Sequence, residues 1–328
     1  MSLYSRIIWA CVIATISIGV RAEWLTEQHA IMGTEVSISV WHKDKSIASN
    51  AVALVVADMQ RIDRTYSSYN PQSELSLLNQ QAALSPQTIT PEMHRLLSAS
   101  LRAGELTGGA FDITYASVGY LYDYREKQRP NDEQIEARKD AINYRWVELG
   151  ENTVLFKHPN VKIGLGGIAK GYAVDRATAI LVEQGIEHAS VSAGGDSRLL
   201  GDRIGRPWLI GIKNPRQNPA IAEDDIALRI PLSDAAVSTS GDYERYFIDE
   251  QTNERVHHIV NPRSGKSATG VVSVTVIGAT GLETDPLSTG VFVLGVEEGL
   301  ALINQLEGIE VIIIDRFGKV HYSNGLEP

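Results

Sequence analysis

The chain has 328 residues, and 43% of them are hydrophobic, which suffices for one large domain or two ordinary ones and excludes a disordered protein. Its formal net charge is −10 and its sequence pI is about 5.3, with Lys and Arg scattered among the acidic residues. This balance offers no basic stripe for a nucleic-acid backbone, so we expect no nucleic-acid partner.

The first 22 residues are predicted to be a secretory signal peptide. Arg6 gives a positive start, residues 7–20 are apolar, and small residues precede a cut after Ala22. The apolar run of about 14 residues is shorter than the roughly 20 that span a bilayer, which disfavours an uncleaved anchor. We therefore expect export to the periplasm, no stable membrane insertion after cleavage, and a mature domain at residues 23–328.

The single cysteine, Cys11, lies inside the apolar run. A lipoprotein anchor is not expected, because its cysteine would have to follow that run and small residues would have to precede it. Cleavage would remove Cys11 and leave a mature protein without cysteine. Such a protein suits an oxidising compartment and has no disulfide, thiolate zinc site or cysteine nucleophile.

One strand and two helices are predicted in the first part of the mature chain. Residues 35–41 alternate polar and apolar side chains, as a half-buried strand does. Residues 47–66 carry apolar side chains on one helical face: Val52, Val55, Met59 and Ile62. The next helix begins at Pro91 with Thr90 as its cap, and the glycine pair at 108–109 ends it.

Strands dominate from about residue 147 onward, and clear helices follow only Gly167 and Asp285. The predicted strands are VLF, VKIGL, ASVSAGG, WLIGIK, IALRIPL, VVSVTVIG and EVIIID. Residues 242–260 form a predicted hairpin with Asp, Asn and Glu at its bend. Separate runs of strands and helices, without a repeat or a long linker, indicate a single compact α+β unit.

The stretch GLGGIAKGYAVD, residues 164–175, is predicted to connect a strand to a helix. Its glycines fit either a structural turn or an anion-binding helix N-terminus, and Lys170 favours the anion. Gly164-x-Gly166-x-x-Ala169 formally matches a dinucleotide fingerprint, but the expected acidic residue is displaced to Asp196. No Gly-Lys-Ser/Thr follows, so the stretch is not a P-loop.

Two adjacent histidines end the predicted hairpin. Because neighbouring strand residues point to opposite faces, only one of His257 and His258 can face a given pocket. A lone strand histidine is more often structural than catalytic, since a general base needs a partner that the sequence does not reveal. The chain has neither an HExxH motif nor a GxSxG elbow, so zinc-protease and α/β-hydrolase hypotheses have no support.

Asp285 and Thr289 carry hard oxygen atoms of the kind that Mg²⁺ binds. Asp285 precedes Pro286, where it is predicted to cap a helix, and Thr289 lies four residues later on the same face. Helix capping is the commoner use of such an aspartate, so these residues alone leave both interpretations open. Tyr69 and the pair Phe111-Asp112 likewise fit either a flat ligand or the core.

Eight segments, taken together and in order, resemble the ApbE family of flavin transferases (FAD:protein FMN transferases). They are MGTEVSISV, SSYNPQSELSLLN, GGAFDIT, GLGGIAKGYAVD, SAGGDSRLLG, STSGDYERYF, HHIVNPRSG and ETDPLSTGVFVLG. The resemblance implies one α+β domain with FAD in a cleft and Mg²⁺ near its pyrophosphate. It also implies that the FMN half of FAD passes to a Thr or Ser hydroxyl of an acceptor protein, with release of AMP. Such acceptors are typically membrane redox subunits.

By position, the resemblance implies a set of FAD-binding residues: Met32, Tyr69, Ala110, Phe111, Asp112, Lys170 and Val260. The implied metal ligands are the backbone carbonyl of Gly167 and the side chains of Asp285 and Thr289. Tyr69 would give a flat stacking surface, and His258 would accept the proton of the incoming hydroxyl. The glycine loop would bring bare backbone to the pyrophosphate, with Lys170 beside the anion.

Two positions depart from the family pattern. Gly164 stands where the glycine loop usually begins with Asp, and Asn261 replaces the Asp of a DPRTG turn. The missing carboxylates motivate one alternative, a non-catalytic FAD-binding protein. A second alternative is an FAD pyrophosphatase, in which water replaces the acceptor hydroxyl. A NAD-linked oxidoreductase, suggested by the fingerprint at Gly164, ranks last. Because the pair Asp285 and Thr289 is intact, we expect an active enzyme despite the two missing carboxylates.

Overall fold

The computed structural model describes residues 23–216 and 226–326. The predicted signal peptide at residues 1–22, with Cys11, lies outside these ranges. Within them the chain forms a single compact α+β domain, which confirms the predicted fold class.

An eight-stranded sheet organises the domain, and every neighbouring pair of its strands is antiparallel. Its strands, in spatial order, are β1 (Trp24–Ile31), β2 (Thr34–Trp41), β6 (His188–Ala193), β7 (Asp196–Leu200), β10 (Ala236–Gly241), β13 (Val271–Gly278), β14 (Glu310–Asp315) and β15 (Val320–Tyr322). The sequence analysis placed β2, β6, β13 and β14 correctly and missed β1, β7, β10 and β15. Strand β1 reads WLTEQHAI, in which four consecutive polar residues, 26–29, interrupt the alternation of apolar and polar side chains.

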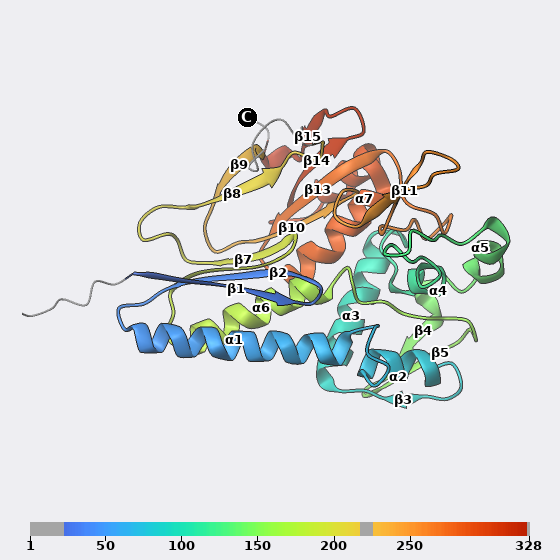
Figure 1. The fold of residues 1–328 in the computed structure, drawn as a ribbon, viewed down its shortest axis with the longest axis horizontal. Helices are drawn as coiled ribbons and strands as arrows, with labels where there is room; N and C mark the ends of the chain where they lie inside the picture. Colours follow the sequence, from blue (N-terminus) through green and yellow to red (C-terminus); the bar gives the residue numbers. More distant parts are fainter. Residues whose placement is uncertain (1–22, 217–225, 327–328) are drawn as a thin grey trace, which may run out of the picture.

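Three helices pack against this sheet and against one another: α1 (Lys45–Tyr66), α6 (Ala169–Glu183) and α7 (Gly281–Ile303). In Figure 1, α1 and α6 lie below strands β1 and β2. The face of α1 predicted from the apolar spacing is buried at all four positions, and the Asp44 side chain caps the helix by accepting from Ser46 N. Burial of this apolar face holds α1 on the sheet.

The remaining elements lie at the end and the edges of the sheet. A lobe on the right of Figure 1 contains α2 (Glu74–Gln81), β3 (Gln87–Thr88), α3 (Pro91–Leu106), α4 (Ala116–Gly119), α5 (Asp132–Lys139), β4 (Val147–Leu149) and β5 (Thr153–Phe156). Two separate hairpins are β8 (Trp208–Lys213) with β9 (Ile226–Leu232), and β11 (Tyr246–Ile248) with β12 (Arg255–His257). Helix α3 begins at Pro91 with Thr90 as its cap, as predicted.

Helix α7 is the core helix of the C-terminal half. Among the described residues it is the one helix that is long and apolar enough to span a membrane by length and composition. It packs on β10 and β13, however, and buries Leu287, Val291 and Phe292 in a cluster shared with β13 and β14. The apolar composition of α7 therefore serves the interior of the domain.

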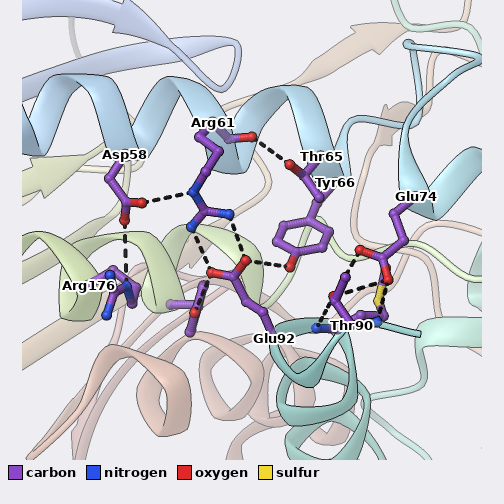
Figure 2. A network of polar contacts seen from close by, with 10 residues as sticks. Asp58, Arg61, Thr65, Tyr66, Glu74, Thr90, Glu92 and Arg176 are labelled. Carbon is purple, nitrogen blue, oxygen red and sulfur yellow. Dashed lines mark hydrogen bonds and ion pairs between the residues drawn. The ribbon is translucent and has the colours of Figure 1, made fainter. Parts of the chain in front are cut away.

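A polar network joins α1, α3 and α6 across the helical layer (Figure 2). Glu92 on α3 accepts two hydrogen bonds from Arg61, at 2.6 and 2.8 Å, and one from Tyr66 Oη at 2.9 Å. Tyr172 Oη on α6 donates a further bond of 2.6 Å to the same carboxylate. Burial alone would raise the pKa of Glu92, but these four donors outweigh it and lower the pKa to about 2.

Replacing Glu92 with glutamine is expected to lower the free energy of unfolding by about 1–3 kcal/mol at pH 7, because charged hydrogen bonds are lost in a half-buried site. The folded-state pKa lies below the ordinary value of 4.5, so this stabilisation is present above pH 4.5 and is lost as the pH falls towards 2. Urea denaturation at pH 7 and pH 3 checks both statements. Glu105→Gln, an exposed change on the same helix, is the control. Equal losses of unfolding free energy in both variants would contradict a stabilising role of the hydrogen bonds to Glu92.

Candidate functional site

The glycine loop is not preceded by a strand. Residues 161–168 have no strand pairing, contrary to the prediction for VKIGL. Asn79 replaces a neighbouring strand: its Oδ1 accepts from Ile163 N at 2.7 Å, and its Nδ2 donates to Ile163 O at 2.9 Å. Ser117 Oγ accepts from Lys162 N at 2.9 Å. Side chains therefore satisfy this backbone, and the strand that a dinucleotide fingerprint requires is missing.

The last glycine of the loop permits two helices to touch through their backbones. A Cβ on Gly171 would lie 2.1 Å from Gly281 O, and a Cβ on Gly281 would lie 2.4 Å from Gly171 O. Asp175, one turn further along α6, accepts from the backbone N–H groups of Gly281 and Leu282 at 2.8 and 2.9 Å. The start of α7 is thus fixed against α6 by close approach and by a carboxylate at its N-terminus.

The prediction that Asp285 caps a helix was wrong. Helix α7 begins at Gly281, so Asp285 is not its N-cap but lies inside the helix, with Pro286 next to it. Its Oδ2 accepts from Gly171 N at 2.9 Å, which ties the side chain to the glycine loop. Asp285 is 3% exposed, and burial, together with the nearby Asp196 carboxylate, raises its pKa above the ordinary value.

Lys170 lies between two buried carboxylates. Its Nζ forms an ion pair with Asp196 Oδ2 and lies 4.0 Å from Asp285 Oδ2. Burial alone would lower the pKa of Lys170, but the two carboxylates outweigh this effect and raise it. Asp196, at the start of β7, was predicted only as a displaced dinucleotide ligand; the structure makes it the ionic partner of Lys170.

The three predicted metal ligands lie near one another. A Cβ built on Gly167 would be 3.2 Å from Thr289 Oγ1, and Thr289 lies one helical turn after Asp285 on α7. Ser240 Oγ on β10 lies 3.2 Å from Thr289 Oγ1. The described residues contain no group of three or more His, Cys, Asp or Glu side chains that could hold a metal ion. The oxygen atoms of a carboxylate, a hydroxyl and a backbone carbonyl nevertheless fit a hard cation such as Mg²⁺.

The two histidines have different surroundings, as the strand alternation predicts. His257 is 3% exposed, its Nε2–H donates to Ala268 O at 2.8 Å, and its Nδ1 accepts from Ile259 N at 3.3 Å. Both ring nitrogens of His257 are therefore used inside the protein, and its ring packs edge-on against Phe292. His257 is a structural residue.

His258 keeps one ring nitrogen available. Its backbone N–H donates to Arg245 O at 3.1 Å, and its Nδ1 lies 3.4 Å from the same carbonyl. Because a carbonyl can only accept, Nδ1 carries the hydrogen and Nε2 carries the lone pair. Burial and, after it, the nearby His257 and Arg245 lower the pKa of His258 to about 3. The ring is therefore neutral at pH 7 and able to accept a proton at Nε2.

Arg245 connects His258 with the tip of the first hairpin. Its Nη2 lies 3.4 Å from Gly33 O, next to Met32, which adopts a left-handed conformation with φ 56°. Met32 N donates to Asp63 Oδ2 at 3.2 Å. The tip borders an open groove of about 500 Å³, whose lining includes Met32, Gly33 and Asp63. Sequence analysis did not single out Arg245; its place inside the segment STSGDYERYF, three residues after Asp242, was the only signal.

Three further residues predicted to bind FAD, Ala110, Phe111 and Asp112, are consecutive in the chain and buried. Phe111 is buried beside the glycine loop, since a Cβ on Gly167 would lie 3.2 Å from its ring, and Ala110 is buried next to it. Asp112 holds two turns: it accepts from Thr114 N and from Tyr144 N, both at 2.8 Å. Its carboxylate is thus occupied by the protein itself.

Tyr69 and Val260 have different surroundings. Tyr69 is 81% exposed, and the Arg125 guanidinium stacks over its ring at 5.7 Å. Val260 is buried and forms a bridge with Ser267. Within the described residues, neither forms a hydrogen bond or a ring contact with Lys170, Asp196 or Asp285. An exposed ring such as that of Tyr69 keeps a face for a flat ligand.

The chain matches known proteins along most of its length. The sequence profile of the ApbE family matches residues 32–313. The FAD:protein FMN transferase of Vibrio cholerae is 31% identical over 307 residues, covering 90% of each chain. That of Escherichia coli is 30% identical over 297 residues, covering 88% of this chain and 83% of its own.

Solved structures agree with these matches. The crystal structure of the ApbE protein of Thermotoga maritima superposes with a TM-score of 0.84 at 33% identity, covering 92% of this chain and 98% of its own. The flavin transferase ApbE of Vibrio cholerae gives a TM-score of 0.80 at 29% identity with the same coverage. The glycine loop, the half-buried lysine and the neutral histidine thus lie in a fold shared over nearly the whole domain, and the chain belongs to the ApbE family.

Proposed function

We propose that this enzyme transfers the FMN half of FAD to a Thr or Ser hydroxyl of an acceptor protein and releases AMP. Membership of the ApbE family supports this proposal, as do the relatives named FAD:protein FMN transferase. The observation that carries it to this chain is the difference between the two histidines. Within the described residues, both ring nitrogens of His257 are engaged, whereas His258 keeps an unprotonated Nε2 near Lys170.

The reaction needs one proton acceptor and a held pyrophosphate. The acceptor oxygen attacks the phosphorus on the flavin side, a phosphoester bond forms, and the bond between the two phosphates breaks to release AMP. His258 Nε2 takes the proton of the attacking hydroxyl, while the Arg245 carbonyl keeps the ring in the required tautomer. Lys170 and the backbone N–H groups of the glycine loop would lie beside the phosphates of FAD.

A divalent cation belongs to the proposal. Asp285, Thr289 and the Gly167 carbonyl would hold Mg²⁺, which would neutralise charge on the phosphates of FAD when bound. FAD itself would occupy a cleft between the glycine loop, the first hairpin and His258. The acceptor would be a membrane redox subunit in the periplasm, reached after export and cleavage behind Ala22. N-terminal sequencing of the exported protein tests that cleavage.

Mass spectrometry of a threonine-containing acceptor tests the function. After incubation with residues 23–328, FAD and Mg²⁺, we expect an acceptor heavier by one FMN, with AMP appearing in parallel. His258→Asn is expected to slow transfer about 10²- to 10⁴-fold, because a positioned base contributes that much. His257→Asn is expected to lower the melting temperature and to leave the transfer rate of folded enzyme largely unchanged.

Other outcomes separate the alternatives. AMP without a modified acceptor would indicate hydrolysis of FAD by water. FAD binding without AMP at any Mg²⁺ concentration would indicate a non-catalytic flavin-binding protein. If His258→Asn transferred FMN as fast as the unchanged enzyme, His258 would not be the base.

A further inference from the structure

We propose that Arg245 binds the pyrophosphate of the FAD substrate, as a cation of the site that pairs with no carboxylate of the described residues. This inference rests on the proposed function and adds a binding residue that neither the sequence motifs nor the family resemblance assigns. It is carried by the charge balance around Lys170, by the contacts of Arg245, and by its position beside His258.

The buried charges around Lys170 do not favour an anion by themselves. Lys170 is paired with Asp196 and approaches Asp285, so one positive charge stands against two carboxylates. A pyrophosphate brings further negative charge into the same space. Burying it there is costly unless cations outside this group balance the charge. Lys170 alone cannot supply that balance, because its charge is already used.

Arg245 has unused donor capacity. None of its guanidinium nitrogens lies within 4.0 Å of a carboxylate in the part of the chain that the structure describes. Its one recorded side-chain hydrogen bond, to Gly33 O, is long at 3.4 Å. An arginine has five N–H donors, so most of them remain free. By contrast, Arg216 is fully engaged by Asp242, with bonds of 2.8 and 2.7 Å.

The position of Arg245 joins the parts of the site. Its backbone carbonyl accepts from His258, which fixes the residue next to the proposed base. Its side chain reaches the tip of the first hairpin at Gly33. Its positive charge acts to lower the pKa values of Lys170 and Tyr115. Tyr115 lies beside the glycine loop, since a Cβ built on Gly164 would be 3.2 Å from its hydroxyl. Arg245 is thus a second cation near the glycine loop. An anion bound between Arg245 and Lys170 would offset the repulsion between their positive charges.

Binding of FAD and of riboflavin, which lacks phosphate, tests the inference. Flavin fluorescence is titrated with residues 23–328 in EDTA, so that no metal ion contributes. We expect Arg245→Gln to weaken FAD binding about 10- to 100-fold, as the loss of charge-assisted hydrogen bonds does, and to leave riboflavin binding unchanged. Arg245→Lys should recover part of the affinity because it keeps the charge without the planar fork. Arg229→Gln, exposed on β9, is the matched control.

Two results of these titrations would contradict a role of Arg245 in binding pyrophosphate. Equal affinities of the Arg245→Gln and unchanged proteins for FAD would overturn the inference, as would an equal loss of FAD and riboflavin binding, which would indicate a structural role. The proposed function fails separately: if the unchanged protein binds FAD but never modifies an acceptor, the transferase proposal falls while the affinity comparison still tests Arg245.

Discussion

Replacing Asp285 with alanine is expected to reduce FMN transfer by at least about 10²-fold, because a metal ion supplies several kcal/mol of charge stabilisation only while its ligands hold it. The same change removes the acceptor of Gly171 N–H and one of the two carboxylates near Lys170. Transfer is measured by the mass of the acceptor and by released AMP. Removing Mg²⁺ with EDTA should reproduce the defect in the unchanged enzyme.

A second variant separates metal binding from packing. Asp285→Asn keeps an oxygen that can accept from Gly171 N–H but removes the negative charge. We expect it to melt close to the unchanged protein but not to show the rise in melting temperature that we expect Mg²⁺ to produce in the unchanged protein. Glu297→Gln, exposed on the same helix, is the control. A Mg²⁺-dependent rise that survives in Asp285→Asn would show that this carboxylate is not a ligand.

Replacing Gly171 with alanine is expected to destabilise the domain by roughly 3 kcal/mol or more, at the upper end of overpacking effects. The added methyl group would lie 2.1 Å from Gly281 O, and backbone cannot move aside as a side-chain end can. Helices α6 and α7 would have to separate, carrying Lys170 and Asp285 with them. Urea denaturation measures the loss.

Gly166→Ala is the matched control for this change. A Cβ on Gly166 meets only Tyr115 Oη at 3.7 Å, an ordinary contact. We therefore expect its free energy of unfolding to stay within about 1 kcal/mol of the unchanged protein, given the usual gain or loss for such a change. Equal destabilisation by both alanines would contradict the close backbone contact as the cause.

Local signals predicted much of the fold. The cap at Thr90 and the apolar face of α1 are properties of neighbouring residues, and both were placed correctly. The strand predicted at VKIGL was wrong because its backbone hydrogen bonds go to the side chains of Asn79 and Ser117, distant in sequence. The N-cap predicted at Asp285 was wrong because Asp175, on another helix, serves the start of α7.

The site was predictable where a motif carries the chemistry. Alternation along the strand showed that only one histidine could face a pocket, and the structure shows that His257 is the inward one. The family resemblance, rather than the spacing of residues, suggested the grouping of Gly167, Asp285 and Thr289. The contact of Arg245 with Gly33 and the ion pair of Asp196 with Lys170 were not predicted, because they join elements that no local pattern connects.

The order of strands in the large sheet bears on how the domain assembles. From β1 to β15, each strand pairs with the sheet strand that precedes it in the chain, and the other elements are inserted between these strands. A chain that emerges N-terminus first can therefore extend the sheet from one edge, and no late strand has to enter between two that are already paired. Each pairing still closes a loop, and the longest, between β2 and β6, spans the whole lobe of α2–α5. We expect that closure to be the slow step of folding, and later strands to add quickly once it is made.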